Sequence, residues 1–428
     1  MAANHIQTTR CCIAGGGPAG LMLGYLLARA GVPVIVLEKH ADFLRDFRGD
    51  TVHPSTLQVL DEVGLQDRFS QLSQRRVHQL GVRIGNRLQQ VVDFRGLKPF
   101  DYLSLVPQWD FLDMLADEGR RYPGFDLRLR HKAIGLIEQQ GRVAGVRVLS
   151  PDGELAIPAD LVVACDGRQS VLREAAGLRA KEFGAPMDVL WFRLKRDDSD
   201  PEDTFLILGS GRLMVLLNRT EYWQAAYLVP KGSDKQLRSH QIENLRNSVA
   251  RLVPFLADCS NELRSWDDVK TLEVRVDRLE RWYRPGLLLI GDAAHAMSPI
   301  GGVGINLAIQ DAVAAANVVA PALAAGGPIG EALLRKVQDR RLPPTRWTQA
   351  VQLQIQRRLI SKVLSRSEEP PEIPPVIRWL LRFRAVRNIP ARLIGHGFRR
   401  EPVRTVEAQA AARRQSQIDP VGRRGPLR

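Results

Sequence analysis

Two glycine-rich segments, nearly 280 residues apart, carry the residues best suited to binding a nucleotide cofactor. In the first, Gly15, Gly17 and Gly20 follow a short apolar run at the spacing G-x-G-x-x-G. In this pattern the first glycine allows a tight turn, the second lets backbone approach a pyrophosphate, and the third lets a helix pack on its strand. The expected helix opens with Pro18 and Ala19, and its N-terminal N–H groups would point at the phosphates.

A carboxylate stands at the end of the next expected strand, residues 32–37. Glu38 lies 18 residues beyond Gly20, where a carboxylate accepts hydrogen bonds from ribose hydroxyls. Lys39 follows directly and is a further candidate contact. The order of strand, helix, strand and acid predicts dinucleotide binding over a plain glycine-rich turn. It does not choose between FAD and NAD.

The second segment favours FAD. Gly291 and Asp292 follow an apolar strand, where an aspartate can accept hydrogen bonds from a polyol such as the ribityl chain of FAD, which NAD lacks. The loop after it lacks side chains at several positions, so that a flat ring could approach backbone. The next helix would aim its N-terminus at a ring that is anionic when reduced. The candidate contacts in this loop and helix are Gly302, Val303, Gly304, Ile305 and Asn306.

Three motifs, in order, make the chain resemble the class A flavoprotein monooxygenases, the FAD-dependent aromatic hydroxylases related to para-hydroxybenzoate hydroxylase. The glycine motif with Glu38 is the first, and Gly291-Asp292 resembles the "GD" motif of the family. Residues 164–173, around Asp166, resemble its "DG" motif, which is associated with FAD and NAD(P)H. The resemblance covers about residues 8–325.

The resemblance implies further site residues. It places FAD contacts at Arg48, at Gln108 and at the backbone of Ala133, and it puts Pro299 in the loop that frames the ring and the oxygen site. His53 becomes a candidate for a flavin-side or proton-relay role, against the alternative of a structural histidine.

The resemblance also implies an activity. NAD(P)H would reduce non-covalently bound FAD, and O2 would add at C4a to give a hydroperoxyflavin that hydroxylates an electron-rich substrate. NAD(P)H would bind transiently, because the sequence holds no second G-x-G-x-x-G motif. Two alternatives stay open, an alkene reductase similar to geranylgeranyl reductase and a non-catalytic FAD-binding scaffold.

The predicted fold is α/β: a Rossmann-like FAD-binding domain with an inserted antiparallel-sheet substrate domain and C-terminal helices. The FAD-binding domain is expected in residues 1–75, 105–185 and 276–330, and the sheet domain in residues 76–104 and 186–275. A helical segment would cover residues 331–405, followed by a basic, disordered tail at 406–428.

Apolar residues on two expected strands of the inserted sheet are candidates for lining the substrate site. They are Met214, Leu216, Trp223 and Tyr227, with ordinary sheet packing as the alternative. Because residues 213–217 offer few polar groups, we expect a small-molecule substrate that is a large apolar aromatic or is isoprenoid-like.

Charge and cysteine content limit the partners and the compartment. The chain of 428 residues carries a net charge of +14, and residues 376–428 hold 13 Arg against three acids. Residues 376–400 could pack on the catalytic body or contact a membrane surface. Nucleic-acid binding is not expected, because the basic residues do not alternate with aromatic ones. The four cysteines show neither metal-ligand spacing nor a disulfide framework, so we expect no metal and a cytoplasmic enzyme without a membrane-spanning helix.

Overall fold

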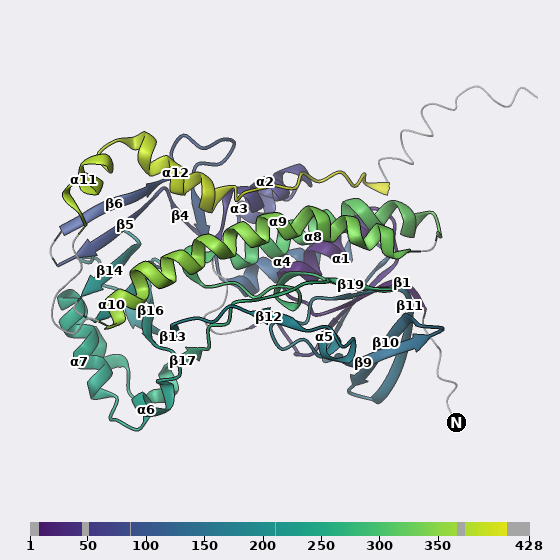
Figure 1. The fold of residues 1–428 in the computed structure, drawn as a ribbon, viewed down its shortest axis with the longest axis horizontal. Coiled ribbons are helices and arrows are strands. Elements are labelled where there is room, and N and C mark those ends of the chain that lie inside the picture. The colour runs from purple at the N-terminus through teal and green to yellow at the C-terminus, as the bar shows by residue number, and fades with distance from the viewer. Residues whose placement is uncertain are drawn as a thin grey trace, which may run out of the picture.

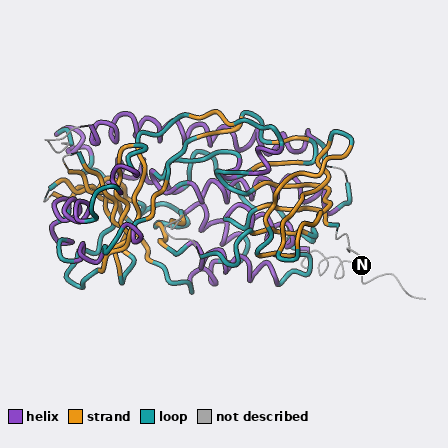
Figure 2. The backbone as a smooth tube through the Cα atoms, turned by 90° about the horizontal axis from the view of Figure 1, so that it is seen from below, coloured by secondary structure: helices purple, strands orange, loops and turns teal. Residues whose placement is uncertain are grey.

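The computed structural model describes residues 8–44, 51–85, 87–209, 211–327, 329–365 and 373–408. Strands gather at both ends of an elongated molecule and helices run between them (Figures 1 and 2). This is the predicted α/β architecture, with a Rossmann-like domain at one end, a second sheet at the other, and helices from the C-terminal part of the chain.

The Rossmann-like sheet brings the ends of five parallel strands to one edge. Its order is β19-β20-β11-β1-β2-β8, and all neighbours are parallel except β19 and β20. The strands are β1 (Thr9–Ala14), β2 (Val34–Glu38), β8 (Phe125–Leu129), β11 (Gly153–Ala164), β19 (Tyr283–Arg284) and β20 (Leu287–Leu289). Because carboxyl ends of parallel strands meet at one edge, the three predicted motifs, which follow β1, β11 and β20, become neighbours there.

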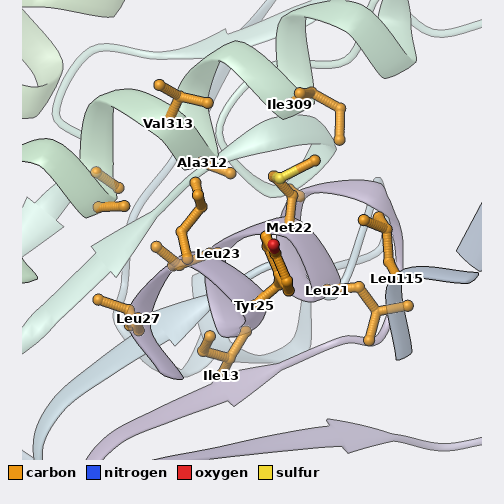
Figure 3. Packing of buried hydrophobic residues seen from close by; sticks show 14 of the residues in the cluster. Ile13, Leu21, Met22, Leu23, Tyr25, Leu27, Leu115, Ile309, Ala312 and Val313 are labelled. Atoms are coloured by element: carbon orange, nitrogen blue, oxygen red, sulfur yellow. The ribbon is translucent and has the colours of Figure 1, made fainter. Parts of the chain in front are cut away.

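Helices α1 (Pro18–Arg29), α4 (Gln108–Arg120) and α8 (Gly304–Ala324) pack with this sheet into the largest apolar cluster. Figure 3 shows Met22 and Leu23 of α1 pointing toward Ile309 and Ala312 of α8. Ten of the twelve residues of α1 are buried, because the sheet covers one side and α4 and α8 cover the others. The helix that begins at the glycine motif is therefore fixed on all sides.

A hairpin extends this sheet. It pairs β9 (Lys132–Gln139) with β10 (Arg142–Ser150), and β10 pairs with the first half of β11. Gln140 and Gly141 form the turn with φ of 50° and 74°. Gly141 suits this turn, since glycine adopts positive φ without strain.

The second sheet has seven strands in the order β17-β13-β16-β15-β14-β5-β6. They are β5 (Gln79–Ile84), β6 (Arg87–Asp93), β13 (Met187–Lys195), β14 (Phe205–Gly209), β15 (Arg212–Asn218), β16 (Tyr222–Pro230) and β17 (Lys270–Leu272). The sequence predicts an antiparallel sheet, and one pair differs, since β14 and β5 are parallel. That pair joins two separate passes of the chain, so no hairpin forces the strands to run in opposite directions.

Shorter elements complete the two ends. Two small sheets contain β3 (Thr51–Val52), β4 (Arg75–Val77) and β7 (Leu103–Leu105), and β12 (Ala180–Glu182) and β18 (Asp277–Leu279). The short α-helices are α2 (Pro54–Glu62), α3 (Gln66–Ser70), α5 (Val171–Ala175), α6 (Asp234–Arg238) and α7 (Glu243–Leu252). The 3-10 helices are η1 (Pro254–Leu256), η2 (Cys259–Glu262), η3 (Trp266–Asp268), η4 (Gly291–Ala293) and η5 (Ile300–Gly302).

The C-terminal part begins with a helix that runs along the length of the molecule (Figure 1). Its elements are α9 (Glu331–Ile355), the π-helical turn η6 (Gln356–Ile360), α10 (Ser361–Ser365), α11 (Pro375–Leu380) and α12 (Arg384–Gly395). From residue 399 the chain is extended and lies along α8, where the Asn317 amide contacts Pro402 O at 2.8 Å and Arg404 N at 2.7 Å. Residues 409–428 of the predicted tail lie outside the described residues.

One stretch of the described chain, Ile300–Ala324, is long and apolar enough to cross a bilayer. In this structure 72% of its apolar window is buried, between α1 and α9. The apolar character of α8 is thus explained by its place in the core.

Candidate flavin site

The turn between β1 and α1 leaves an open cradle at the start of the helix. Gly15 has a φ of 109°, and a Cβ on it would lie 2.3 Å from the carbonyl oxygen of Cys165. A Cβ on Gly20 would lie 1.9 Å from Gly15 O, so both positions need glycine. Gly17 differs, since no side chain caps α1 there and a Cβ would meet no atom within 4 Å. The first N–H groups of α1 therefore face open space, an arrangement that fits a pyrophosphate.

Glu38 flanks this cradle at the end of β2. Its carboxylate is 9% exposed and accepts hydrogen bonds from the backbone N–H groups of Gly16 and His40, both at 3.0 Å. The N–H of His131 donates to the carbonyl oxygen of Glu38 at 2.9 Å, which brings half-buried Ala133 to the same side. Glu38 and Ala133, both predicted to contact FAD, thus lie on the same side.

The aspartate predicted to hold the ribityl chain pairs with an arginine of the "DG" segment. Arg168 Nε donates to Asp292 Oδ2 at 3.1 Å, and the two side chains are 27% and 35% exposed. Asp166 instead accepts from the N–H of Leu172 at 3.2 Å, at the start of α5, and burial raises its pKa. Asp292 is therefore the more accessible of the two carboxylates.

A buried carboxylate beneath Gly291 holds the "GD" segment in place. Asp311 of α8 accepts hydrogen bonds from Gly291 N at 3.1 Å, from His295 Nε2 at 2.6 Å and from Arg341 Nε at 2.8 Å. Burial would raise the pKa of Asp311, but His295 and Arg341 outweigh it, so the pKa lies below its ordinary value of 3.8. Arg341 also lies 3.8 Å from Glu401, which ties the C-terminal extended segment to this motif.

The loop from Pro299 to Asn306 presents bare backbone. Gly301 and Gly302 have φ of 77° and 62°, in the left-handed region that favours glycine. Gly304 opens α8, which no side chain caps, and a Cβ on Gly304 would meet no atom within 4 Å. The N-terminus of α8 thus faces open space, where its dipole would stabilise an anionic ring by about 0.3–2 kcal/mol.

The Asn306 side chain fastens this loop to β3 and α2. Its Oδ1 accepts hydrogen bonds from His53 N at 2.9 Å and Thr56 Oγ1 at 2.7 Å. Its Nδ2 donates to the carbonyl oxygens of Thr51 at 3.1 Å and Gly302 at 3.2 Å. The amide is therefore used within the protein, and Asn306 fixes where the loop lies.

Three buried glutamines of α9 and η6 hold the same loop from the other side. Gln349 Nε2 donates to Ala296 O at 3.0 Å, and Gln352 Nε2 donates to Ser298 O at 3.0 Å. Gln356 Nε2 donates to Ser298 Oγ at 2.8 Å. These residues recur every three or four positions, so one helix face carries all three amides. The long helix therefore positions the backbone that leads into the glycine loop.

His53 lies behind the glycine loop and is fully buried. Its Nδ1 is 2.7 Å from the carbonyl oxygen of Ile394, and because a carbonyl only accepts, Nδ1 carries the proton. Its Nε2 has no hydrogen-bond partner and would lie 3.6 Å from a Cβ on Gly302. Burial lowers the pKa of His53 to about 4, so the imidazole is neutral near pH 7.

These features fit FAD: two uncapped helix N-termini, an acid at the end of β2, and an accessible acid beside a bare loop. A family model described as an FAD binding domain matches residues 8–352. The chain belongs to the class A flavoprotein monooxygenases.

Individual relatives of this flavoprotein are also monooxygenases. The 6-methylpretetramide 4-monooxygenase of Streptomyces rimosus is 34% identical over 361 residues, 82% of this chain and 85% of that protein. The 12-dehydrotetracycline 5-monooxygenase/anhydrotetracycline 6-monooxygenase of Streptomyces rimosus subsp. rimosus is 29% identical over 70% of this chain, which spans 60% of that protein. The crystal structure of pqsL, a probable FAD-dependent monooxygenase from Pseudomonas aeruginosa, has a TM-score of 0.71 at 22% identity. The match covers 84% of this chain and 97% of the pqsL chain. This last likeness shows the fold.

Most predicted cofactor residues lie along one edge of the Rossmann-like sheet or on the elements that follow it. They are Gly15, Gly17, Pro18, Ala19, Gly20, Glu38, Asp166, Gly291, Asp292, Gly302, Val303, Gly304, Ile305 and Asn306. Lys39 is exposed after β2, Gln108 is the half-buried first residue of α4, and Pro299 is half-buried at the start of the loop. Arg48 lies outside the described residues. Direct contact of these residues with FAD stays a prediction.

The predicted substrate residues lie on the sheet face turned away from the glycine loop. Met214, Leu216, Trp223 and Tyr227 belong to an apolar cluster with residues of α7, η1 and η2. Ile300 of the loop packs with the other face of the sheet. Neighbours along a strand point to opposite faces, so residues adjacent in sequence to these four face the loop.

Sequence reasoning missed Asp311, Arg341 and the pairing of Arg168 with Asp292. A signal for Asp311 exists, because it is the single charged residue of α8, and a charge in an apolar buried helix needs a partner. No local pattern identifies Arg341 as that partner, since it lies 30 residues further along.

His53 predicts a pH dependence of stability. Its pKa is about 4 in the folded chain against an ordinary 6.5, so the unfolded chain takes up a proton first as pH falls. Stability is fully present above pH 6.5 and declines as pH falls toward 4, by about 2 kcal/mol between pH 7 and pH 5. Urea unfolding at each pH should show that His53→Gln lacks this part of the decline. Parallel declines in both proteins would contradict a neutral buried His53.

Asp292 predicts a specific loss of FAD affinity. Asp292→Ala removes a charged acceptor, a loss of about 1.5–3 kcal/mol, which corresponds to about tenfold to a hundredfold weaker binding. Fluorescence titration of apoprotein with FAD measures this. Asp339→Ala is the control, because Asp339 also pairs with an arginine, Arg335, but on the exposed surface of α9. Equal FAD affinities of the two variants would show that Asp292 does not hold the cofactor.

Proposed function

We propose that this flavoprotein uses NAD(P)H and O2 to hydroxylate an extended, apolar aromatic substrate. The observation that carries the proposal is the apposition of the bare glycine loop to one apolar face of the seven-stranded sheet, through Ile300. Support also comes from relatives whose names specify 6-methylpretetramide and anhydrotetracycline as substrates of monooxygenases.

The residues of this chain would hold and orient the cofactor. The N-terminus of α1 and Glu38 would bind the pyrophosphate and the adenosine ribose, and Asp292 the ribityl chain. The N-terminus of α8 would stabilise the reduced ring. FAD, when bound, supplies hydride acceptance from NAD(P)H and the activation of O2. The apolar sheet would exclude water from the reacting atoms.

The loop-side face of the sheet provides the surface for substrate. Trp191, Leu206, Val215 and Leu272 are half-buried apolar residues on this face, together with Ile300 of the loop. The opposite face is filled by the α7 cluster, whose sheet residues Met214 and Leu216 are fully buried. An apolar surface with area still to bury suits a broad ring system better than a small carboxylate.

The two alternative functions have less support. Relatives of this chain include several monooxygenases and hydroxylases. We propose a cytoplasmic location, since all four cysteines are free. We also propose that residues 376–400 contact a membrane surface. The described residues contain no group of three or more His, Cys, Asp or Glu side chains that could hold a metal.

The reaction is tested by mixing the FAD-loaded protein and NADPH or NADH with tetracyclic and smaller phenols. A suitable tetracyclic phenol should accelerate NAD(P)H oxidation, and O2 should be consumed at the same rate. Mass spectrometry should show that the phenol has gained one oxygen atom. Oxidation of NAD(P)H without O2 consumption would favour the reductase, and no oxidation with any phenol would favour the scaffold.

Two adjacent residues of β15 test which sheet face meets the substrate. Val215 is half-buried on the loop-side face, so Val215→Phe should change the KM about tenfold. Its effect on stability should be small, because the overpacking cost of about 1–3 kcal/mol applies where a side chain is tightly enclosed. Met214 faces α7, so Met214→Ala should lower stability by about 2–5 kcal/mol and leave the KM unchanged. Steady-state kinetics and thermal unfolding of both variants decide it. The reverse pattern would return the substrate to the α7 face.

A further inference from the structure

Exposed apolar side chains are concentrated in one part of the C-terminal region. Of the 16 large apolar residues that are exposed in the described chain, 12 lie between residues 347 and 398. Single exposed apolar residues are ordinary on protein surfaces, whereas a concentration of this kind marks an interaction site. The region coincides with α11, α12 and one face of α9.

Helix α11 buries none of its residues, although four of its six are large and apolar. Val376, Ile377, Trp379 and Leu380 are 67%, 47%, 54% and 38% exposed. At 100° per residue these four share one side of the helix and Arg378 lies on the other. The described chain therefore leaves much of this apolar side exposed.

The apolar surface continues beyond α11. Phe383 is 49% exposed and stacks edge-on with Trp379, at a centroid distance of 5.0 Å. On α12, Ile389 and Leu393 are 60% and 39% exposed at a spacing of four residues. Phe398 then meets Trp347 of α9 at 5.6 Å. From Trp347, exposed apolar residues recur every four positions to Leu359, so α9 and η6 carry an apolar stripe that the contact with Phe398 joins to the end of α12.

Positive charge accompanies these residues. Residues 373–400 contain seven Arg and no Asp, Glu or Lys. Asp93 of β6 approaches Arg387 at 3.6 Å and Arg384 at 3.9 Å, and Glu401 approaches Arg399 at 4.0 Å. Among the described residues, Asp93 is thus the acid that pairs with α12, and Glu401 pairs with an arginine that follows it.

Several of the arginines have no acid beside them. Arg378, Arg382 and Arg392 are exposed and form no ion pair within the described residues. A two-fold symmetric contact between copies of this chain would place these cations against themselves. The occupant of the surface should therefore be anionic and apolar at once.

We infer that α11 and α12, with the exposed stripe of α9, form a docking surface for an anionic lipid bilayer. Tryptophan, phenylalanine and aliphatic side chains would enter the boundary between headgroups and acyl chains, while the arginines remain at the phosphates. The surface combines the two signals that peripheral membrane binding needs, apolar area and a basic cluster. Lipid binding requires no substrate, so it can be measured independently of the reaction.

The test is sedimentation of the FAD-loaded protein with vesicles of phosphatidylcholine alone or mixed with phosphatidylglycerol. We expect binding to the mixed vesicles at low salt, weaker binding at high salt, and little binding to phosphatidylcholine alone. Arg378→Gln with Arg382→Gln should lower the partition coefficient about thirtyfold, since each basic residue at an anionic surface contributes a factor of about five. Trp379→Ser with Phe383→Ser should lower it about tenfold or more.

A control variant distinguishes binding through this surface from non-specific binding through any exposed apolar residue. Leu88→Ser with Leu149→Ser removes exposed apolar residues of β6 and β10 and should bind vesicles as the parent does. All variants should keep the FAD content and unfolding temperature of the parent, because each replaces side chains that are exposed. Failure of the parent protein to bind mixed vesicles at low salt would overturn the inference. So would a parent dimer that Trp379→Ser with Phe383→Ser converts to a monomer, because the occupant would then be a second copy.

Discussion

The cofactor edge depends on the carboxylate of Asp311. It is fully buried in an otherwise uncharged helix and is compensated by His295, Arg341 and the N–H of Gly291. A buried charge of this kind becomes costly when a partner is lost, so these contacts favour the observed arrangement. That arrangement fixes where Gly291 stands relative to α8, and hence where Asp292 meets the space in front of α1.

A second set of contacts relates the cofactor edge to the sheet domain. Helix α9 begins beside β19, contributes Arg341 to the charged network, and then uses Gln349 and Gln352 to hold the backbone leading into the glycine loop. Its continuation reaches the seven-stranded sheet, where Ile360 and Val363 pack with residues of β13 and β15. One continuous stretch of helix therefore sets the position of the bare loop against the apolar face that we assign to substrate.

The position of the glycine motif and Glu38 at one edge of the sheet could be predicted from sequence, whereas the face of the second sheet on which each apolar residue lies could not. Gly15, Gly20 and Glu38 act within a local β-α-β unit, so their spacing alone carries the information. The face of the sheet cannot be predicted in this way, because the neighbouring residues Met214 and Val215 lie on opposite faces and both are apolar. The partners of Asp311 come from 16 and 30 residues away, beyond the reach of any local pattern. The parallel pairing of β14 with β5 could not be predicted for the same reason, because the two strands lie far apart in the sequence.

The contact between Arg341 and Glu401 has a consequence for the order in which the site is assembled during synthesis. The glycine turn at residues 15–20 emerges from the ribosome early, yet the carboxylate network under Gly291 is completed only by residues 341 and 401. Nearly the whole described chain must therefore be made before the ribityl side of the site is rigid. A growing chain can form the phosphate cradle long before it can retain the flavin, so cofactor capture should be a late, largely post-translational event.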